Sequence, residues 1–253
     1  RLMLTICKRN VCTLKKPNPL QNKKPVRMMS IKRFTKKNLA LGGVFFGSLY
    51  QYTIVRDIKD VILLADYGAE MIPFLKTWVN FPLSIAFLYT YQRLSQSVSD
   101  RNLYLYIYLG ISTLYALLGI VLYPNSSFIV ETTNLPFLRK IIIILFYSLS
   151  SIWGSGIVSL LFWSLANRFT AYTEAKSLYP LFGVIANSSL ILSGSVIKYV
   201  SALNLEWNEI VKCLMTSCLL FNIIVVFLQQ YIENNYKENE KIVTNISKNK
   251  ISF

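Results

Sequence analysis

The chain alternates between long apolar segments and short polar connections. Six apolar segments have about the length that a helix needs to cross the ~30 Å hydrocarbon core of a membrane. Such segments cross a bilayer as helices, because lipid offers exposed backbone groups no hydrogen-bond partner. The pattern predicts an all-α membrane protein with six transmembrane helices over residues 39–232. The six segments are 39–55, which can continue as a helix to about residue 64, and 71–91, 103–123, 141–165, 180–202 and 212–232.

Composition agrees with a membrane protein and excludes several kinds of chemistry. Of the 253 residues, 53% are hydrophobic and only 15% are charged, whereas soluble domains carry about 25% charged residues. The absence of histidine excludes Ser-His-Asp catalysis and zinc sites built on histidine. Cys7, Cys12, Cys213 and Cys218 form two C-x4-C pairs, a spacing that predicts neither a metal site nor a disulfide framework. We therefore expect no cofactor and no enzymatic activity.

Positive charge is concentrated at the N-terminus. Residues 1–38 carry twelve Lys and Arg, no Asp or Glu, and three prolines. A basic tail beside apolar spans is typical of a topology determinant or a targeting segment, so no nucleic-acid partner is expected. We predict a disordered or transit-like tail over 1–38, and a polar tail or linker over 233–253. Lys and Arg number 20 on the side of the two termini and 6 on the other, which predicts both termini on the cytoplasm-like side.

The second apolar segment contains a polar stripe. Lys76 lies six residues into it, and Asn80 and Ser84 follow at spacings that place all three on one helix face. A lysine inside a span costs about 2.5–3.5 kcal/mol on insertion scales, so it is expected to face water or a partner. Lys76 can alternatively reach the membrane interface with its long side chain. We favour the first interpretation, a path for an anionic substrate lined by Lys76 and Asn80.

A charged motif, R-D-x-K-D, follows the first apolar segment. On a continuing helix Arg56 and Asp60 are neighbours that can neutralise each other, which leaves Lys59 and Asp57 for other partners. The cations of such a motif can donate hydrogen bonds to phosphate oxygens. The alternative is an ordinary charged helix end that holds the span in register.

Serines recur along the fourth apolar segment at helical spacing. Ser148, Ser151, Ser155 and Ser159 form a ridge flanked by Gly154 and Gly156. Such a ridge can line a pore, but small residues at this spacing more often allow helices to pack closely. We expect packing.

Four sequence strings, taken together, resemble the ATP/ADP translocases of plastids and obligate intracellular bacteria. They are RDIKD, GAEMIPFLKTWVNFPLSIAFLYTYQRLS, IWGSGIVSLLFWSLAN and EAKSLYPLFGVIAN, in the family's order and spacing. The resemblance runs from about residue 38 to 232, and KTWVN is closer to the plastid branch. It implies exchange of ATP for ADP, with phosphate as a companion substrate in plastids, by a multi-pass membrane protein of an organelle or endosymbiont.

The resemblance also implies a fold and a set of site residues. The family has a major-facilitator-like fold of two six-helix halves around a central cavity, and this chain resembles the first half. The family's functional lysine in the second span corresponds to Lys76. The charged motif corresponds to Arg56–Asp60, and the LFW-x-x-AN run ends at Asn167.

The chain departs from the family in two respects. Only the first half of a twelve-span protein is present, so a second six-helix half is a predicted partner. The family pattern FYxxAELWGS reads FYSLSSIWGS here, which places Ser151 where relatives carry a functional acidic residue. Three functions stay open: an ATP/ADP carrier half, a diverged non-transporting membrane partner, and a carrier for another nucleotide such as NAD.

Overall fold

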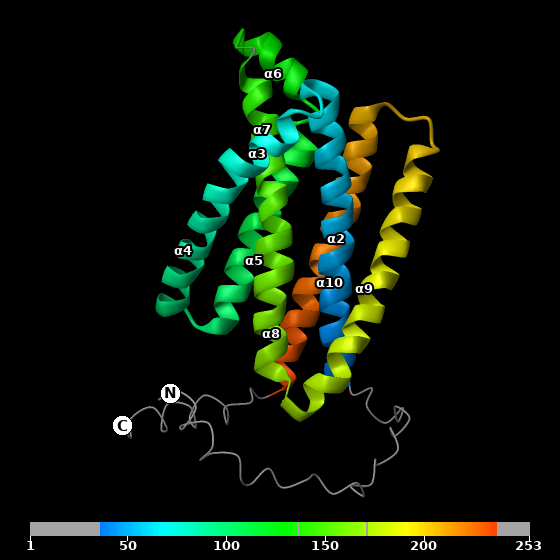
Figure 1. The fold of residues 1–253 in the computed structure, drawn as a ribbon. Coiled ribbons are helices and arrows are strands. Elements are labelled where there is room, and N and C mark those ends of the chain that lie inside the picture. The colour runs from blue at the N-terminus through cyan, green and yellow to red at the C-terminus, as the bar shows by residue number, and fades with distance from the viewer. Residues whose placement is uncertain (1–35, 136, 171, 237–253) are drawn as a thin grey trace, which may run out of the picture. The chain divides into compact units, whose positions relative to one another are not determined.

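A computed structural model describes residues 36–135, 137–170 and 172–236. All regular structure in these ranges is helical (Figure 1), which confirms the prediction of an all-α protein. Most of the predicted basic tail and most of the polar segment 233–253 lie outside the described residues. The last three residues assigned to the basic tail, 36–38, instead begin the first described helix.

The described helices form six rods along the chain, three of which contain π-helical turns, labelled η. In chain order the rods are α2 (Lys36–Tyr67); α3 (Met71–Leu75), η2 (Lys76–Asn80) and α4 (Phe81–Ser97); α5 (Asp100–Ala116) and η3 (Leu117–Leu122); α7 (Phe137–Ile152), η4 (Trp153–Leu161) and α8 (Phe162–Phe169); α9 (Tyr172–Ser201); and α10 (Trp207–Asn235). A short helix, α6 (Ser126–Thr133), precedes α7 and was not predicted.

Five helical stretches of the described chain are long and apolar enough to cross a membrane, and they coincide with the second to sixth predicted segments. The first predicted segment is α2, which is long enough but less apolar, since it contains Gln51 and the charged stretch 56–60. The chain is thus a multi-pass helical membrane protein. The five stretches are Met71–Ser97, Arg101–Leu122, Phe137–Phe169, Glu174–Ser201 and Trp207–Asn235.

Helix α2 lies at the centre of the bundle. It packs against α10, α9 and α7 (Figure 1) and contributes side chains to two buried hydrophobic clusters. In one cluster the ring of Phe45 stacks on that of Phe162 with centroids 4.1 Å apart. In the other, Tyr50 stacks on Phe221 of α10 at 3.9 Å. This central position explains how α2 tolerates polar residues, since most of its surface faces other helices and not lipid.

Several helices begin earlier than the apolar pattern indicates. Helix α9 begins at Tyr172, so Pro180, where the predicted segment starts, lies inside the helix. The polar residues before Pro180 extend the helix beyond the apolar part, which a hydropathy pattern does not detect. Neighbouring helices and local backbone adjustments allow a proline in such a position.

The start of α2, the end of α8 and the end of α10 meet at one end of the bundle. Lys37 Nζ donates a hydrogen bond to the carbonyl oxygen of Phe169 at 2.9 Å, and Arg168 forms a 2.6 Å ion pair with Glu233. The described chain therefore enters and leaves the bundle at the same end. The side of the membrane on which the termini lie stays a prediction.

The two described cysteines are free thiols. Cys213 is exposed and Cys218 is buried. Cys7 and Cys12 lie outside the described residues.

Candidate functional site

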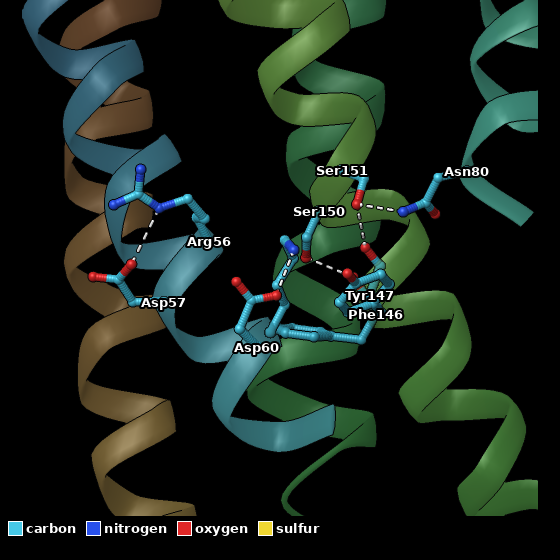
Figure 2. Close-up of polar contacts among 9 residues, drawn as sticks. Arg56, Asp57, Asp60, Asn80, Phe146, Tyr147, Ser150 and Ser151 are labelled. Atoms are coloured by element: carbon cyan, nitrogen blue, oxygen red, sulfur yellow. Dashed lines mark hydrogen bonds and ion pairs between the residues drawn. The ribbon is translucent and has the colours of Figure 1, made fainter. Parts of the chain in front are cut away.

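The charged motif on α2 forms ion pairs between adjacent residues. Arg56 Nε lies 3.2 Å from Asp57 Oδ1, and Lys59 Nζ lies 2.7 Å from Asp60 Oδ1. The predicted pairing of Arg56 with Asp60 is therefore wrong. Figure 2 shows Arg56 turned toward Asp57 and away from Asp60. Because each cation pairs with its own neighbour, each carboxylate holds one basic side chain in place.

Lys59 is the buried member of this motif. Its side chain is only 8% exposed, and its ammonium group lies 4.1 Å from the ring centroid of Tyr147 on α7. A cation over an aromatic face is stabilised by the ring's electrons, more so when water is excluded. The interface between α2 and α7 thus holds a fixed positive charge within the bundle.

Two more cations lie near Lys59. Arg56 and Lys76 are both within electrostatic range of its ammonium group. Lys76 is exposed in this chain and lies at the start of η2. The structure therefore gathers the three predicted cations from two helices into one region, although Lys76 itself makes no ion pair among the described residues.

Asn80 and Ser151 contact each other directly. Asn80 is buried at the end of η2, and its amide Nδ2 donates a hydrogen bond to Ser151 Oγ at 2.9 Å (Figure 2). Ser151 in turn donates to the carbonyl oxygen of Tyr147 at 3.0 Å. Within the described structure the amide oxygen of Asn80 has no hydrogen-bond partner. Ser151, where the family resemblance predicts an acid in relatives, thus lies beside the polar stripe of the second span.

The site is built on an irregular helix. Lys76 and Asn80 are the first and last residues of the π-helical segment η2. Short π-helical insertions occur frequently at functional sites, because they re-aim side chains and loosen the regular backbone bonding. Sequence periodicity did not reveal this segment, because five residues are little more than one turn of either helix and too few to distinguish their periods.

Asn167 does not belong to this cluster. It is exposed near the end of α8, where Tyr179 of α9 donates a hydrogen bond to its amide oxygen. Figure 1 places α8 at the opposite end of the bundle from α3, which directly precedes η2. The structure therefore does not bring Asn167 to the other predicted site residues.

The glycines of the fourth segment, more than its serines, provide the close packing. A Cβ added at Gly154 would lie 2.5 Å from the ring of Tyr52, and one at Gly156 would lie 2.7 Å from that of Phe87. Ser155 and Ser159 are exposed and donate hydrogen bonds to carbonyls of their own helix. The ridge is therefore only partly a packing surface.

Sequence reasoning missed the aromatic members of the site. Tyr147 lies against Lys59, and the ring of Tyr52 lies 5.7 Å from the guanidinium carbon of Arg56. The available signal was spacing: Tyr147 is one helical turn before Ser151, and Tyr52 one turn before Arg56. Both tyrosines lie in apolar segments, where aromatic residues are common and do not by themselves indicate a site.

The fold and the site define a class of protein, a helical membrane bundle with a buried lysine between two of its helices and further cations near it. Sequence comparison gives the family. Residues 20–252 match the TLC ATP/ADP transporter family, and the chain belongs to it. The family is one of transporters and not of enzymes.

Named relatives come from plants and bacteria. The plastidic ATP/ADP-transporter of Solanum tuberosum is 41% identical over 199 residues, which are 72% of this chain and 32% of the relative. ADP,ATP carrier protein 1, chloroplastic, of Arabidopsis thaliana is 42% identical over 185 residues, 66% of this chain and 30% of the relative. ADP,ATP carrier protein 1 of Chlamydia trachomatis is 34% identical over 191 residues, which are 69% of this chain and 36% of the relative. The matched part of the chain thus spans about a third of the length of these relatives. No solved structure matches the chain significantly.

Proposed function

We propose that the chain forms the first half of a nucleotide antiporter that exchanges ATP for ADP across a plastid-type membrane, with phosphate as a further substrate. Membership of the ATP/ADP transporter family supports this function, and the names of the plant relatives support the compartment. The observation that carries the proposal is a lysine, Lys59, buried in a membrane bundle, with two further cations, Arg56 and Lys76, close enough to act on its charge.

The chemistry of the substrate fits these cations. Nucleoside di- and triphosphates carry several negative charges. A path for them through a membrane needs positively charged side chains, held in place by the protein, that compensate this charge where water is scarce. Arg56 can bind phosphate oxygens through its planar fork, whereas a lysine acts as a point charge. Asp57 and Asp60 each hold one basic side chain in place. We infer that incoming phosphate oxygens compete with these carboxylates for the cations.

Asn80 supplies a different type of contact. Its amide nitrogen donates to Ser151, while its amide oxygen is buried and has no hydrogen-bond partner among the described residues, so a substrate reaches it only when the second span moves away from α7. An acceptor beside a phosphate-binding cluster suits a hydroxyl or amino group of a nucleoside. We propose Lys76, Arg56 and Lys59 for the phosphates, and Asn80 for a neutral part of the substrate.

Alternating access requires a second set of helices. Transport by rocking needs two bundles around one site, so we propose that this chain pairs with a further six-helix half. The rod that carries Lys76 also exposes large apolar side chains, among them Trp78 and Phe81 at 69% and 65% exposure. Such a surface fits contact with lipid or with a partner half.

The test is nucleotide exchange in vesicles that carry the chain with its second half. Vesicles preloaded with ADP take up radiolabelled ATP, and Lys76→Gln is expected to reduce the initial rate at least tenfold with the protein still inserted. Lys140→Gln, an exposed lysine outside the cluster, is the matched control and is expected to leave the rate unchanged. Uptake by Lys76→Gln at the wild-type rate would remove this lysine from the site.

A second function is favoured by one observation, the serine at position 151. The family resemblance implies an acid at this position, and we propose that a chain without it can bind nucleotide without exchanging it, as a diverged membrane partner. Ser151→Glu separates the two functions, because it is expected to raise the exchange rate of an impaired carrier and to change nothing in an inert one. Competition by unlabelled NAD in the same assay tests the third possibility, since cations that bind phosphate do not distinguish the base.

A further inference from the structure

A cavity of about 510 Å³ opens between α2, α9 and α10, and none of the charged residues of the candidate site lines it. Its volume lies within the range of about 300–1,000 Å³ found for small-molecule sites. The side chains of Ile185 and Leu228 lie directly against the backbone of α2, because Gly42 and Gly43 have no side chains there. A Cβ added at these glycines would lie 2.6 and 2.7 Å from them. The cavity is therefore lined by apolar side chains and by the backbone of α2 at these two glycines.

The lining changes character along the cavity. Lys36, the first residue of α2, lines one end together with Tyr231, near the end of α10. Phe46 lines it ten residues further along α2, which is about 15 Å at 1.5 Å per residue. That length is half of the ~30 Å hydrocarbon core, or the depth of one leaflet. A tyrosine at the outer end fits the membrane interface.

Lys36 is exposed and has no ion pair or hydrogen bond among the described residues, whereas its neighbour Lys37 pairs with Glu174. A cation without a partner in the described part of the chain, at the interface end of an apolar cavity one leaflet deep, matches a lipid with a negative headgroup and a hydrocarbon tail. The chain's own segment 1–34 is a poor occupant, because it contains ten Lys and Arg and no acidic residue. It would bring like charge to Lys36.

We propose that this cavity binds one acyl chain of an anionic phospholipid, with the lipid phosphate against Lys36. The apolar walls hold the acyl chain, and Lys36 selects the headgroup. The site is separate from the nucleotide site, and it stands whether or not the chain exchanges nucleotides.

The test uses the purified full chain in nanodiscs of equal phosphatidylglycerol and phosphatidylcholine. Native mass spectrometry then identifies and counts the lipid molecules that stay bound to the protein when it is released from the nanodisc. One lysine near a membrane surface is worth about 1 kcal/mol toward anionic lipid, or about fivefold in binding. We expect the wild type to retain phosphatidylglycerol about fivefold over phosphatidylcholine at one site. Lys36→Gln should bring the two lipids close to parity, and Lys36→Arg should keep the preference.

Two further variants complete the design. Leu39→Trp enlarges an exposed residue that lines the cavity and should reduce retention of both lipids. Lys140→Gln, an exposed lysine that does not line the cavity, should behave as the wild type. Equal retention of the two lipids by the wild type would overturn the proposal, and so would the same loss of preference in Lys36→Gln and Lys140→Gln. A severalfold rise in lipid retention on deletion of residues 1–34 would also overturn it, because the chain's own segment would then be the occupant.

Discussion

The ion pair of Lys59 and Asp60 allows a structural role to be separated from a role in substrate binding. The two charges are 2.7 Å apart, with side-chain exposures of 8% and 39%. Coulomb attraction at this distance is about 6 kcal/mol at an effective dielectric constant of 20, but desolvation offsets most of it. Breaking a fully buried pair costs about 3–5 kcal/mol, and an exposed pair contributes about 0.2–1 kcal/mol. For a pair with one half-exposed member we expect a coupling energy of about 2 kcal/mol.

A double-mutant cycle measures this coupling. Lys59→Met, Asp60→Asn and the double variant are compared with the wild type by unfolding in mixed micelles with increasing SDS, followed by tryptophan fluorescence. Each single change should destabilise the bundle, and the double variant should recover part of the loss because neither charge is left alone. Nucleotide binding should be weak in both chains that lack Lys59, including the better-folded double variant.

Two outcomes would refute this reasoning. A coupling energy below about 0.5 kcal/mol, within the usual additivity of independent sites, would show that the pair does not stabilise the folded protein. Wild-type nucleotide affinity in the folded double variant would show that Lys59 does not contact phosphate.

Two further predictions concern polar contacts between helices. Tyr108 accepts a hydrogen bond from Gln51 at 3.0 Å and donates one to Asn222 at 2.8 Å. Tyr108→Phe should therefore cost about 1–2 kcal/mol in the same unfolding assay, whereas the exposed Tyr106→Phe should cost little. Glu233→Gln removes the charge that faces Arg168 at 2.6 Å, where the two side chains are only 5% and 14% exposed. It should cost about 2–3 kcal/mol and speed amide hydrogen exchange at the end of α8, and unchanged exchange there would contradict the contact.

The positions of most helices followed from the sequence because membrane crossing imposes a length and an apolar composition. The central position of α2 did not follow. Its polar Gln51 and its Lys59 are buried among other helices, whereas Arg56, Asp57 and Asp60 remain partly exposed. The periodicity of apolar residues distinguishes the faces of one helix. It does not show which face packs against other helices and which contacts lipid.

The sequence predicted which residues belong to the candidate site, but it did not predict which of them contact each other. Lys76 and Asn80 were identified by a polar stripe, and Ser151 by a departure from the family pattern, as separate features. Their meeting depends on how the second span packs against α7, and no local signal contains that information. The pairing on α2 was wrong for a related reason: helix spacing permits Arg56 to reach Asp60, but the contact of Lys59 with Tyr147 turns the lysine inward and brings its ammonium group to Asp60.

The serine at position 151 changes the charge balance of the site. The three cations there outnumber the two carboxylates, Asp57 and Asp60, so these five side chains together carry a net positive charge. An acid at position 151 would neutralise that charge and accept the hydrogen bond that Asn80 now gives to Ser151. An anionic substrate that enters the serine-containing site meets no competing charge at this position, so binding is favoured and release is opposed. Ser151→Glu should therefore weaken nucleotide affinity and accelerate exchange together, and a variant that binds more tightly or exchanges more slowly would show that an acid at this position acts in another way.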